Sequence, residues 1–249
     1  MAQRIKIRYR EKTNSNPAAQ TSSIPNRLML IRKVLVAAIT GKIAEEHVDS
    51  AINIMAEALV IAEDEIRGLA VIALFELGGS PAKLVPILRR AAMDPNETVR
   101  RRAVRVLAEY GEESLLALDT LIHALGDNDP VVRMEAVNSL GKVGPAAEPA
   151  IPLLIEMLQS MECRIWITVR ACLRKIGPAC VNYLSPLLKH FNPLVRERVI
   201  NFIGQMRYLD EEVVQQLLEC CRDSDEEVRK AAYRAIEQLE RAAGGIPVV

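Results

Sequence analysis

The chain has 249 residues, with 32 Lys and Arg against 32 Asp and Glu, so its formal charge at neutral pH is zero. This balance argues against nucleic acid or an anionic membrane as a partner held by bulk electrostatics. Half of the residues are apolar and only 4% are aromatic, which excludes a disordered chain and favours packed helices over sheets.

The first residues form a basic polar segment. Residues 1–24 carry Arg4, Lys6, Arg8, Arg10 and Lys12 but only one acidic residue. We interpret the segment as a flexible solvated tail, and its weak likeness to a transit peptide is the alternative. The longest apolar run, residues 34–39, is far shorter than the roughly 20 residues of a membrane-spanning helix. We therefore expect a soluble, cytoplasmic protein without membrane insertion.

A Val/Ile-Arg pair recurs along the chain at an almost constant spacing. Consecutive copies lie 33 residues apart, except for one step of 30, and the fourth copy has Trp in place of Arg. The copies are Ile66-Arg67, Val99-Arg100, Val132-Arg133, Ile165-Trp166, Val195-Arg196 and Val228-Arg229. Such a period indicates stacked repeats, because a single short unit cannot bury its own apolar face. We number these repeats one to six.

Other positions recur in register with the pair. Three residues after the Arg stands Ala or Val, and seven residues after it stands Leu or Ile. Together with the Val or Ile before the Arg, these residues give an apolar stripe along one helix face. An Asp precedes the Arg by six residues at Asp94, Asp127 and Asp223, where it marks a turn. Each repeat is therefore predicted to be a helix, an Asp-containing turn and a second helix.

The pattern Asp-x5-Arg, with Val before the Arg and Ala and Leu after it, resembles the HEAT-repeat family, and most of all its short, phycobilisome-lyase-like repeats. The resemblance implies an all-α fold, a right-handed α-solenoid of about six to seven helical hairpins over residues 25–243. A degenerate N-terminal hairpin would contain Ile31-Arg32, and residues 244–249 would form a flexible tail. It also implies that the second helices line a concave face and that Asp and Arg form ladders between repeats. It implies little about function.

Repeats four and five depart from the pattern. In repeat four, Ser160 replaces the Asp and Trp166 the Arg, while repeat five has His190 at the Asp position and is three residues shorter. We interpret the joint loss in repeat four as a sign of pairing, because an Asp without its Arg would be a poorly compensated buried charge. We expect a change of curvature or a contact site around Trp166.

No catalytic, cofactor-binding or metal-ligating residue is predicted. His47, His123 and His190 lie in separate repeats without a second ligand at a repeated spacing. The Cys residues, an odd number without paired C-x-x-C spacing, are interpreted as small core residues in a reduced compartment. Trp166 is interpreted as a packing or inter-repeat residue, because the chain lacks the aromatic platform and positive charge of a nucleic-acid groove.

Outward positions on the second helices are the predicted binding surface. They lie one, two, five, eight and nine residues after the ladder residue, away from the apolar stripe. Arg101, Arg102 and Arg105 are expected to form the densest basic cluster there, with Arg100 held by Asp94 and Asp127. The predicted partner-binding residues are Arg101, Arg102, Arg105, Trp166, Arg174, Lys175, Arg198 and Arg234. The alternative is an ordinary solvated face with i,i+4 pairs.

The same outward positions are apolar in repeat one. Leu69, Ile72 and Phe75 stand there, either to bind a hydrophobic anchor or to be covered by the N-terminal hairpin. We favour cover, because exposed apolar patches on solenoid ends are normally capped.

The sequence predicts a non-enzymatic scaffold that binds an acidic protein segment or peptide, or a mixed one, through its concave face. The alternative is a HEAT-type enzyme, either bilin lyase-like or DNA glycosylase-like. A third possibility is that the basic tail docks the protein on nucleic acid or an anionic surface. Neither the identity of the partner nor the oligomeric state is predicted.

Overall fold

The computed structural model describes residues 24–158, 163–206 and 211–242. Within these ranges the chain forms α-helices and 3-10 helices and no strand, which confirms the predicted all-α solenoid class. The two predicted tails, residues 1–24 and 244–249, lie outside the described residues except for Ile24, where the first helix begins. The chain divides into two compact units, residues 1–139 and 140–249.

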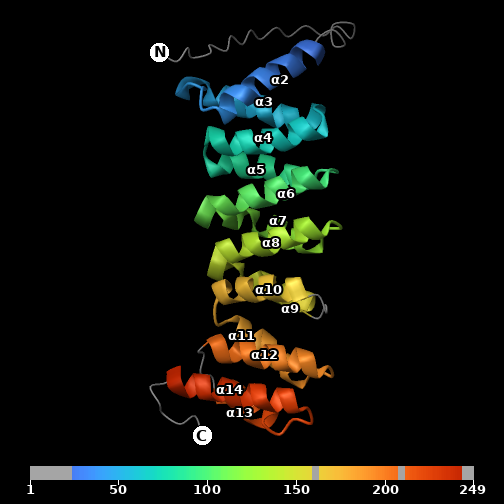
Figure 1. Ribbon diagram of the computed structural model, residues 1–249. Coiled ribbons are helices and arrows are strands. Elements are labelled where there is room, and N and C mark those ends of the chain that lie inside the picture. The colour runs from blue at the N-terminus through green and yellow to red at the C-terminus, as the bar shows by residue number, and fades with distance from the viewer. Residues whose placement is uncertain (1–23, 159–162, 207–210, 243–249) are drawn as a thin grey trace. The chain divides into compact units, whose positions relative to one another are not determined.

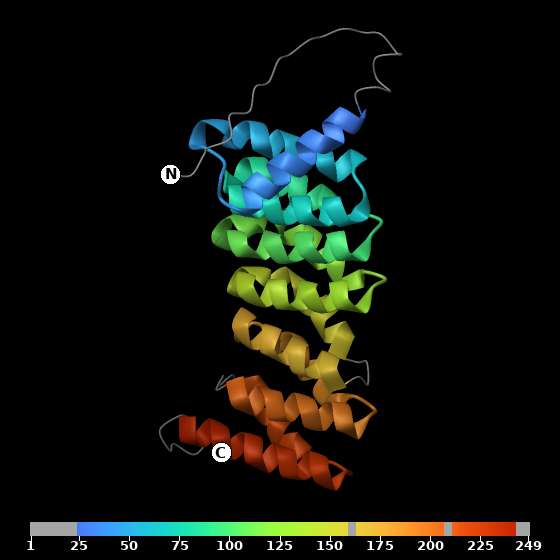
Figure 2. The ribbon, with the colours of Figure 1, turned by 45° about the horizontal axis from the view of Figure 1, so that its top comes forward.

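The first unit is a stack of helical hairpins built on long second helices. Its elements are α2 (Ile24–Ile39), η1 (Glu45–His47), α3 (Val48–Ile61), α4 (Asp64–Leu77), α5 (Pro81–Ala91), α6 (Glu97–Leu107), η2 (Ala108–Ala117), α7 (Leu118–His123), η3 (Ala124–Gly126) and most of α8 (Pro130–Val143). The second helix α4 packs between α2 and α6 (Figures 1 and 2). The N-terminal helix α2 therefore occupies the place of a second helix, as expected for a degenerate first hairpin.

The second unit repeats this arrangement, with first helices of five to ten residues against 14 in α3, 11 in α5 and 6 in α7. Its elements are η4 (Gly144–Ala150), α9 (Ile151–Leu158), α10 (Cys163–Ile176), α11 (Cys180–Leu184), η5 (Ser185–Lys189), α12 (Pro193–Met206), α13 (Glu211–Cys220) and α14 (Glu226–Ala242). Prolines at Pro145, Pro149 and Pro186 lie in its 3-10 segments. Proline lacks the N–H that an α-helix interior needs, which agrees with the 3-10 geometry of these two segments, although η2 in the first unit is a 3-10 helix without proline.

The core of each unit follows the stripe read from the sequence. In α6, for example, Val99, Ala103 and Leu107 are all fully buried. The stripe changes in α10, where Val169 and Leu173 are fully buried but Trp166 takes part in the core in place of Ile165, which is only half-buried. None of the described helices combines the length and apolar character needed to cross a membrane.

The repeat Arg closes the turn of its own hairpin. Arg100 Nη1 donates to the carbonyl oxygens of Asp94 and Pro95, both at 2.9 Å. Equivalent pairs of bonds reach the carbonyls six and five residues upstream from Arg133, Arg196 and Arg229. Each of these bonds satisfies a carbonyl in a tight turn that no helix bond can reach.

The rest of the same guanidinium binds the Asp of the following repeat. Arg100 Nε and Nη2 donate to the two carboxylate oxygens of Asp127, both at 2.8 Å. The pairs Arg67–Asp94 and Arg196–Asp223 have the same two-bond geometry. Arg100 is thus held by the Asp127 carboxylate and the Asp94 carbonyl. Among the described residues, the first unit contains two such rungs of the ladder and the second unit one.

The direction of this ladder corrects the interpretation of repeat four. Because each Arg pairs with the next repeat's Asp, the joint loss concerns Trp166 of repeat four and His190 of repeat five, not Ser160 and Trp166. Ser160 lies outside the described residues. His190 Nδ1 accepts the backbone N–H of Asn192 at 3.1 Å, as Asp94 Oδ1 accepts that of Asn96 at 2.8 Å. The histidine therefore keeps the turn-capping role of the Asp without its negative charge.

Candidate functional site

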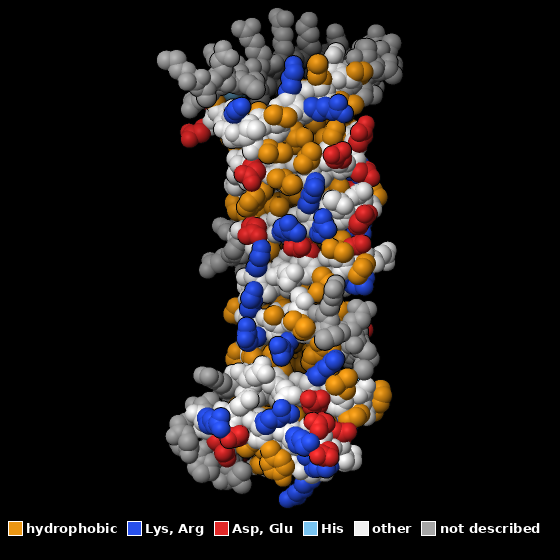
Figure 3. All heavy atoms as spheres, viewed as in Figure 1, with side chains coloured by type: hydrophobic (Ala, Val, Ile, Leu, Met, Phe, Trp, Pro, Cys, Tyr) orange, Lys and Arg blue, Asp and Glu red, His pale blue; other side chains and the backbone are white. Residues whose placement is uncertain are grey.

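The predicted basic cluster of the first unit lies on α6, and Figure 3 shows Lys and Arg side chains gathered over this helix beside hydrophobic side chains over α4. Arg105 is not a free cation, because its Nε and Nη2 donate to the carboxylate of Glu135, both at 3.1 Å. These hydrogen bonds raise the pKa of Arg105 above its ordinary value. Arg105 is therefore already paired within the protein, and its role in binding a partner remains a prediction.

The other two arginines of the cluster are half-buried. Arg102 folds back over α4, where its Nη1 lies 2.6 Å from the place a Cβ would occupy on Gly68. Arg101 Nε is buried and has no hydrogen-bond partner among the described residues. Part of the charge of Arg101 and Arg102 is therefore turned toward the protein, and their role in binding a partner remains a prediction.

The apolar positions of repeat one stay partly open. Phe75 is 40% exposed and makes an edge contact with Tyr110, with ring centroids 6.3 Å apart. Leu69 and Ile72 are half-buried. The helix α2 packs against α4, yet the expected cover does not extend to Phe75.

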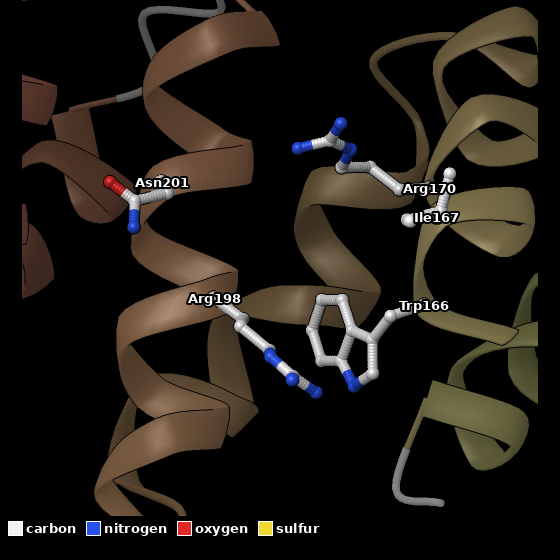
Figure 4. Close-up of a pocket in the computed structure, with 5 residues that line it drawn as sticks. All are labelled: Trp166, Ile167, Arg170, Arg198 and Asn201. Carbon is white, nitrogen blue, oxygen red and sulfur yellow. The ribbon is translucent and has the colours of Figure 1, made fainter. Parts of the chain in front are cut away.

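A pocket in the second unit contains two of the predicted residues. Trp166, Ile167 and Arg170 of α10 and Arg198 and Asn201 of α12 line a pocket of about 180 Å³ (Figure 4). The Arg198 guanidinium carbon lies 5.0 Å from the centroid of the Trp166 ring, within the range of a cation–π interaction. The structure thus brings Trp166 and Arg198 together and adds Ile167, Arg170 and Asn201, which were not predicted.

The pocket lies where Arg170 breaks the apolar stripe of repeat four. The position four residues after the ladder residue holds Val71, Val104, Val137 and Ile200 in four other repeats, all fully buried, whereas repeat six has Tyr233 there, 62% exposed. An isolated arginine cannot be buried in this way without a large desolvation cost, and Arg170 is exposed. The sequence already contained this signal, since Arg170 is the one charged residue at this position among the six repeats.

Hydrogen-bond donors dominate the pocket. Trp166 Nε1 and Arg198 Nη1 are buried without a hydrogen-bond partner among the described residues. Asn201 Nδ2 donates to Glu197 Oε1 at 3.3 Å. An indole N–H and a guanidinium can only donate, so the arrangement can accept a group that carries lone pairs and negative charge.

The remaining predicted residues also lie in the second unit. Arg174 and Lys175 are exposed at the end of α10, and Arg234 is exposed on α14, where its Nε donates to the Lys230 carbonyl at 3.2 Å. Over the described ranges, no three His, Cys, Asp or Glu side chains are placed to hold a metal ion.

Comparisons with known proteins identify the type of repeat. The family described as HEAT repeats matches residues 81–167 and 164–237. A HEAT-like repeats protein from the archaeon Thermococcus onnurineus NA1 is 18% identical, with 87% of this chain and 97% of that chain covered and a TM-score of 0.50. This level of identity shows the fold alone.

Two artificial proteins are also similar in structure. A designed armadillo repeat protein is 20% identical, with 74% of this chain and 98% of that chain covered and a TM-score of 0.45. An engineered protein is 20% identical, with 77% and 97% covered and a TM-score of 0.48. A search of curated proteins gives no match. None of these matches distinguishes the phycobilisome-lyase-like branch.

Proposed function

Because this chain belongs to the HEAT-repeat family, whose repeats match more than half of it, we propose that it is a non-enzymatic scaffold. In this proposal its second helices bind an acidic or mixed segment of a partner protein. Repeats of this kind present extended surfaces on which a partner chain can lie. The concave form of that surface comes from the family resemblance.

The charge of α10 is the observation that supports an acidic partner. Residues 163–176 contain basic residues and no Asp or Glu. Over the described residues, neither Arg170, Arg174 nor Lys175 has a carboxylate partner. A partner that brings carboxylates to this helix would be electrostatically complementary.

The alternative of an ordinary solvated face accounts well for α14 but not for α10. On α14, Lys230 pairs with Glu226 at 2.8 Å and Arg241 pairs with Glu237 at 2.5 Å, both four residues apart. These are the i,i+4 pairs expected of a solvated helix. Their absence within the described part of α10 favours an external partner there.

Co-purification from the native cell, followed by quantitative mass spectrometry, tests this function. We expect Arg174→Glu/Lys175→Glu to lose the main bound proteins, because the reversed charges repel acidic segments. The matched control is Arg222→Glu, which reverses an exposed charge in the turn before α14. A set of bound proteins that is the same for the wild type and both variants would contradict the proposal.

The first unit is tested separately with Arg101→Glu/Arg105→Glu. Since Glu135 already pairs with Arg105, we expect a smaller loss of bound proteins from this variant than from the α10 variant. Cytoplasmic location remains a prediction that cell fractionation can test. The enzyme alternatives also remain predictions, and no arrangement in the described part of the chain favours them.

A further inference from the structure

We propose that the pocket between α10 and α12 binds the carboxylate side chain of a Glu or Asp in a partner segment. We call it the Trp166 pocket, defined by the lining residues Trp166, Ile167, Arg170, Arg198 and Asn201 (Figure 4). This binding mode rests on the proposed function, since it names the group of the partner that is recognised and the place where it is held.

Unsatisfied donors are the first reason. Trp166 is only 6% exposed, and its Nε1 has no hydrogen-bond partner among the described residues. Arg198 Nη1 is also buried and has no hydrogen-bond partner among the described residues. In Figure 4 the guanidinium of Arg198 points toward the indole nitrogen of Trp166. Leaving such donors without acceptors is unfavourable. A carboxylate supplies two oxygens with several lone pairs, enough to accept from both groups.

Charge is the second reason. Arg198 and Arg170 place two guanidinium groups on this pocket. Glu197, the acidic residue that accepts the hydrogen bond from Asn201, is not among the lining residues. Asp223 is occupied by two hydrogen bonds from Arg196. None of the lining residues carries a carboxylate. A carboxylate from a partner could therefore pair with these arginines, and hydrogen bonds between arginine and a carboxylate are among the strongest available.

Size and shape are the third reason. A volume of about 180 Å³ lies below the roughly 300 Å³ at which small-molecule pockets begin, so it suits one side chain rather than a cofactor. Ile167 is 58% exposed beside the pocket and offers an apolar contact to the methylene groups of an acidic side chain. Arg170 is exposed, so it can meet the ligand before the buried donors do.

Trp166 makes the test direct, because it is the only tryptophan of the chain. The full-length protein is titrated with a short blocked peptide of alternating Glu and Gly while tryptophan emission is recorded. We expect a saturable change in emission, since the carboxylate would meet the indole N–H. The same peptide with Gln in place of Glu should leave the emission unchanged, because it has the same shape without the charge.

Substitutions locate the binding site. Affinity is measured by the anisotropy of a labelled Glu peptide, so that Trp166→Phe, which removes the N–H donor but keeps a ring, can be included. Arg170→Gln, Arg198→Gln and Trp166→Phe should each bind roughly tenfold or more weakly, the effect of losing a hydrogen bond to a charged group. Arg222→Gln, an exposed arginine away from the pocket, should bind like the wild type. Because Arg170 is exposed, its variant decides the result if another variant fails to fold.

Three outcomes would overturn the assignment. No saturable response to the Glu peptide would mean that the pocket holds only solvent. Tight binding of a phosphoserine peptide without binding of the Glu peptide would mean that the ligand is a phosphate group. Equal affinity of Arg170→Gln and Arg222→Gln would place the peptide elsewhere on the protein. In each case the proposed scaffold function is tested independently, by the co-purification experiment on Arg174 and Lys175.

Discussion

At the scale of single residues, the repeat Arg joins two structures at once, its own hairpin turn and the Asp of the next repeat. Arg100 and Asp127 illustrate this, with side chains only 16% and 11% exposed. Asp127 Oδ1 also accepts the backbone N–H of Asp129 at 2.8 Å. Removing one such Asp leaves several donors without an acceptor in a partly dry turn, where an unmade hydrogen bond is costly.

We therefore expect Asp127→Ala to lower the free energy of unfolding by about 2–3 kcal/mol. Urea titration followed by circular dichroism measures the change. The control is Asp49→Ala, which removes an exposed ion pair with Lys83 and should cost less than about 1 kcal/mol. Equal losses for the two variants would show that the ladder contributes no more than a surface pair.

The ladder also predicts how stability depends on pH. The hydrogen bonds from Arg100 lower the pKa of Asp127, and those from Arg196 lower the pKa of Asp223. A lowered folded pKa contributes stability that is present above the unfolded value of about 3.9 and lost as the pH falls through the folded pKa.

We expect the free energy of unfolding to fall as the pH is lowered below about 4, and to fall less steeply in Asp127→Asn. Urea titrations at successive pH values between neutral and acidic measure both slopes. A variant with the same slope as the wild type would show that Asp127 does not contribute to acid sensitivity.

Cysteine reactivity follows from burial at the same scale. Burial raises the pKa of Cys172 and of Cys180 to about 12 and that of Cys220 to about 11. Because the thiolate is the reactive form, we expect these thiols to resist alkylation at mildly alkaline pH in the folded protein. Cys221 is only half-buried and should react before them. Iodoacetamide labelling with peptide mass mapping tests this order, with urea-unfolded protein as the fully labelled control.

Residue-level chemistry was predicted only in part. The ladder was predicted through the resemblance to the HEAT-repeat family, and its direction was not predicted, because the direction depends on how the repeats stack. The same limit explains Arg105, whose partner Glu135 lies 30 residues away in the next repeat. The Trp166 pocket was missed as a unit because Trp166 and Arg198 were predicted as separate contacts on two repeats, and Arg170 was not among the predicted residues.

At the scale of elements, α12 and α14 approach each other closely at a glycine. A Cβ on Gly204 would lie 2.8 Å from both Cα and Cβ of Ala235. On Gly68 a Cβ would meet the flexible end of the Arg102 side chain instead. The two glycines therefore differ in whether a neighbour can move, although both lie inside helices.

We expect Gly204→Ala to lower the free energy of unfolding by about 1–3 kcal/mol, because the added methyl group forces α12 away from α14. Gly68→Ala should be neutral or stabilise by up to about 1 kcal/mol, since alanine favours the helix and Arg102 can shift. Urea titration of both variants gives the comparison. Stabilisation by Gly204→Ala would contradict the close approach.

The elements themselves were predictable to different degrees. Second helices such as α6 follow from an apolar stripe of helical period, because their buried face is continuous. First helices in the second unit were also predicted as helices, but η4 and η5 adopt 3-10 geometry. Prolines inside them remove N–H donors of an α-helix, but proline alone does not determine the geometry, because Pro86 lies inside the α-helix α5.

At the scale of the whole molecule, repeats in a solenoid contact mainly their neighbours, so a local loss of stability stays local. Gly204→Ala should therefore accelerate amide hydrogen exchange in α12 and α14 while leaving α3 and α4 unchanged. Exchange followed by mass spectrometry in the wild type and in the variant measures this. A uniform acceleration along the chain would show that the two compact units unfold as one.

The fold class was the most predictable property, because a period of 33 residues repeated over most of the chain leaves few other architectures. Function was the least predictable, because the same repeat supports many activities. The features that suggest binding are departures from the repeat: Trp166 stands where other repeats have Arg, and Arg170 stands where other repeats have an uncharged residue.

The direction of the ladder means that a repeat of the first unit can in principle be duplicated without losing an Arg–Asp pair. A segment from Asp94 to Gly126 has an Asp that accepts from the preceding Arg and an Arg that donates to the following Asp. Inserting a second copy of that segment would preserve every such pair. Between repeats four and five, Trp166 replaces the Arg and His190 replaces the Asp. These two repeats can therefore be duplicated or transferred to another protein only if both residues are moved together.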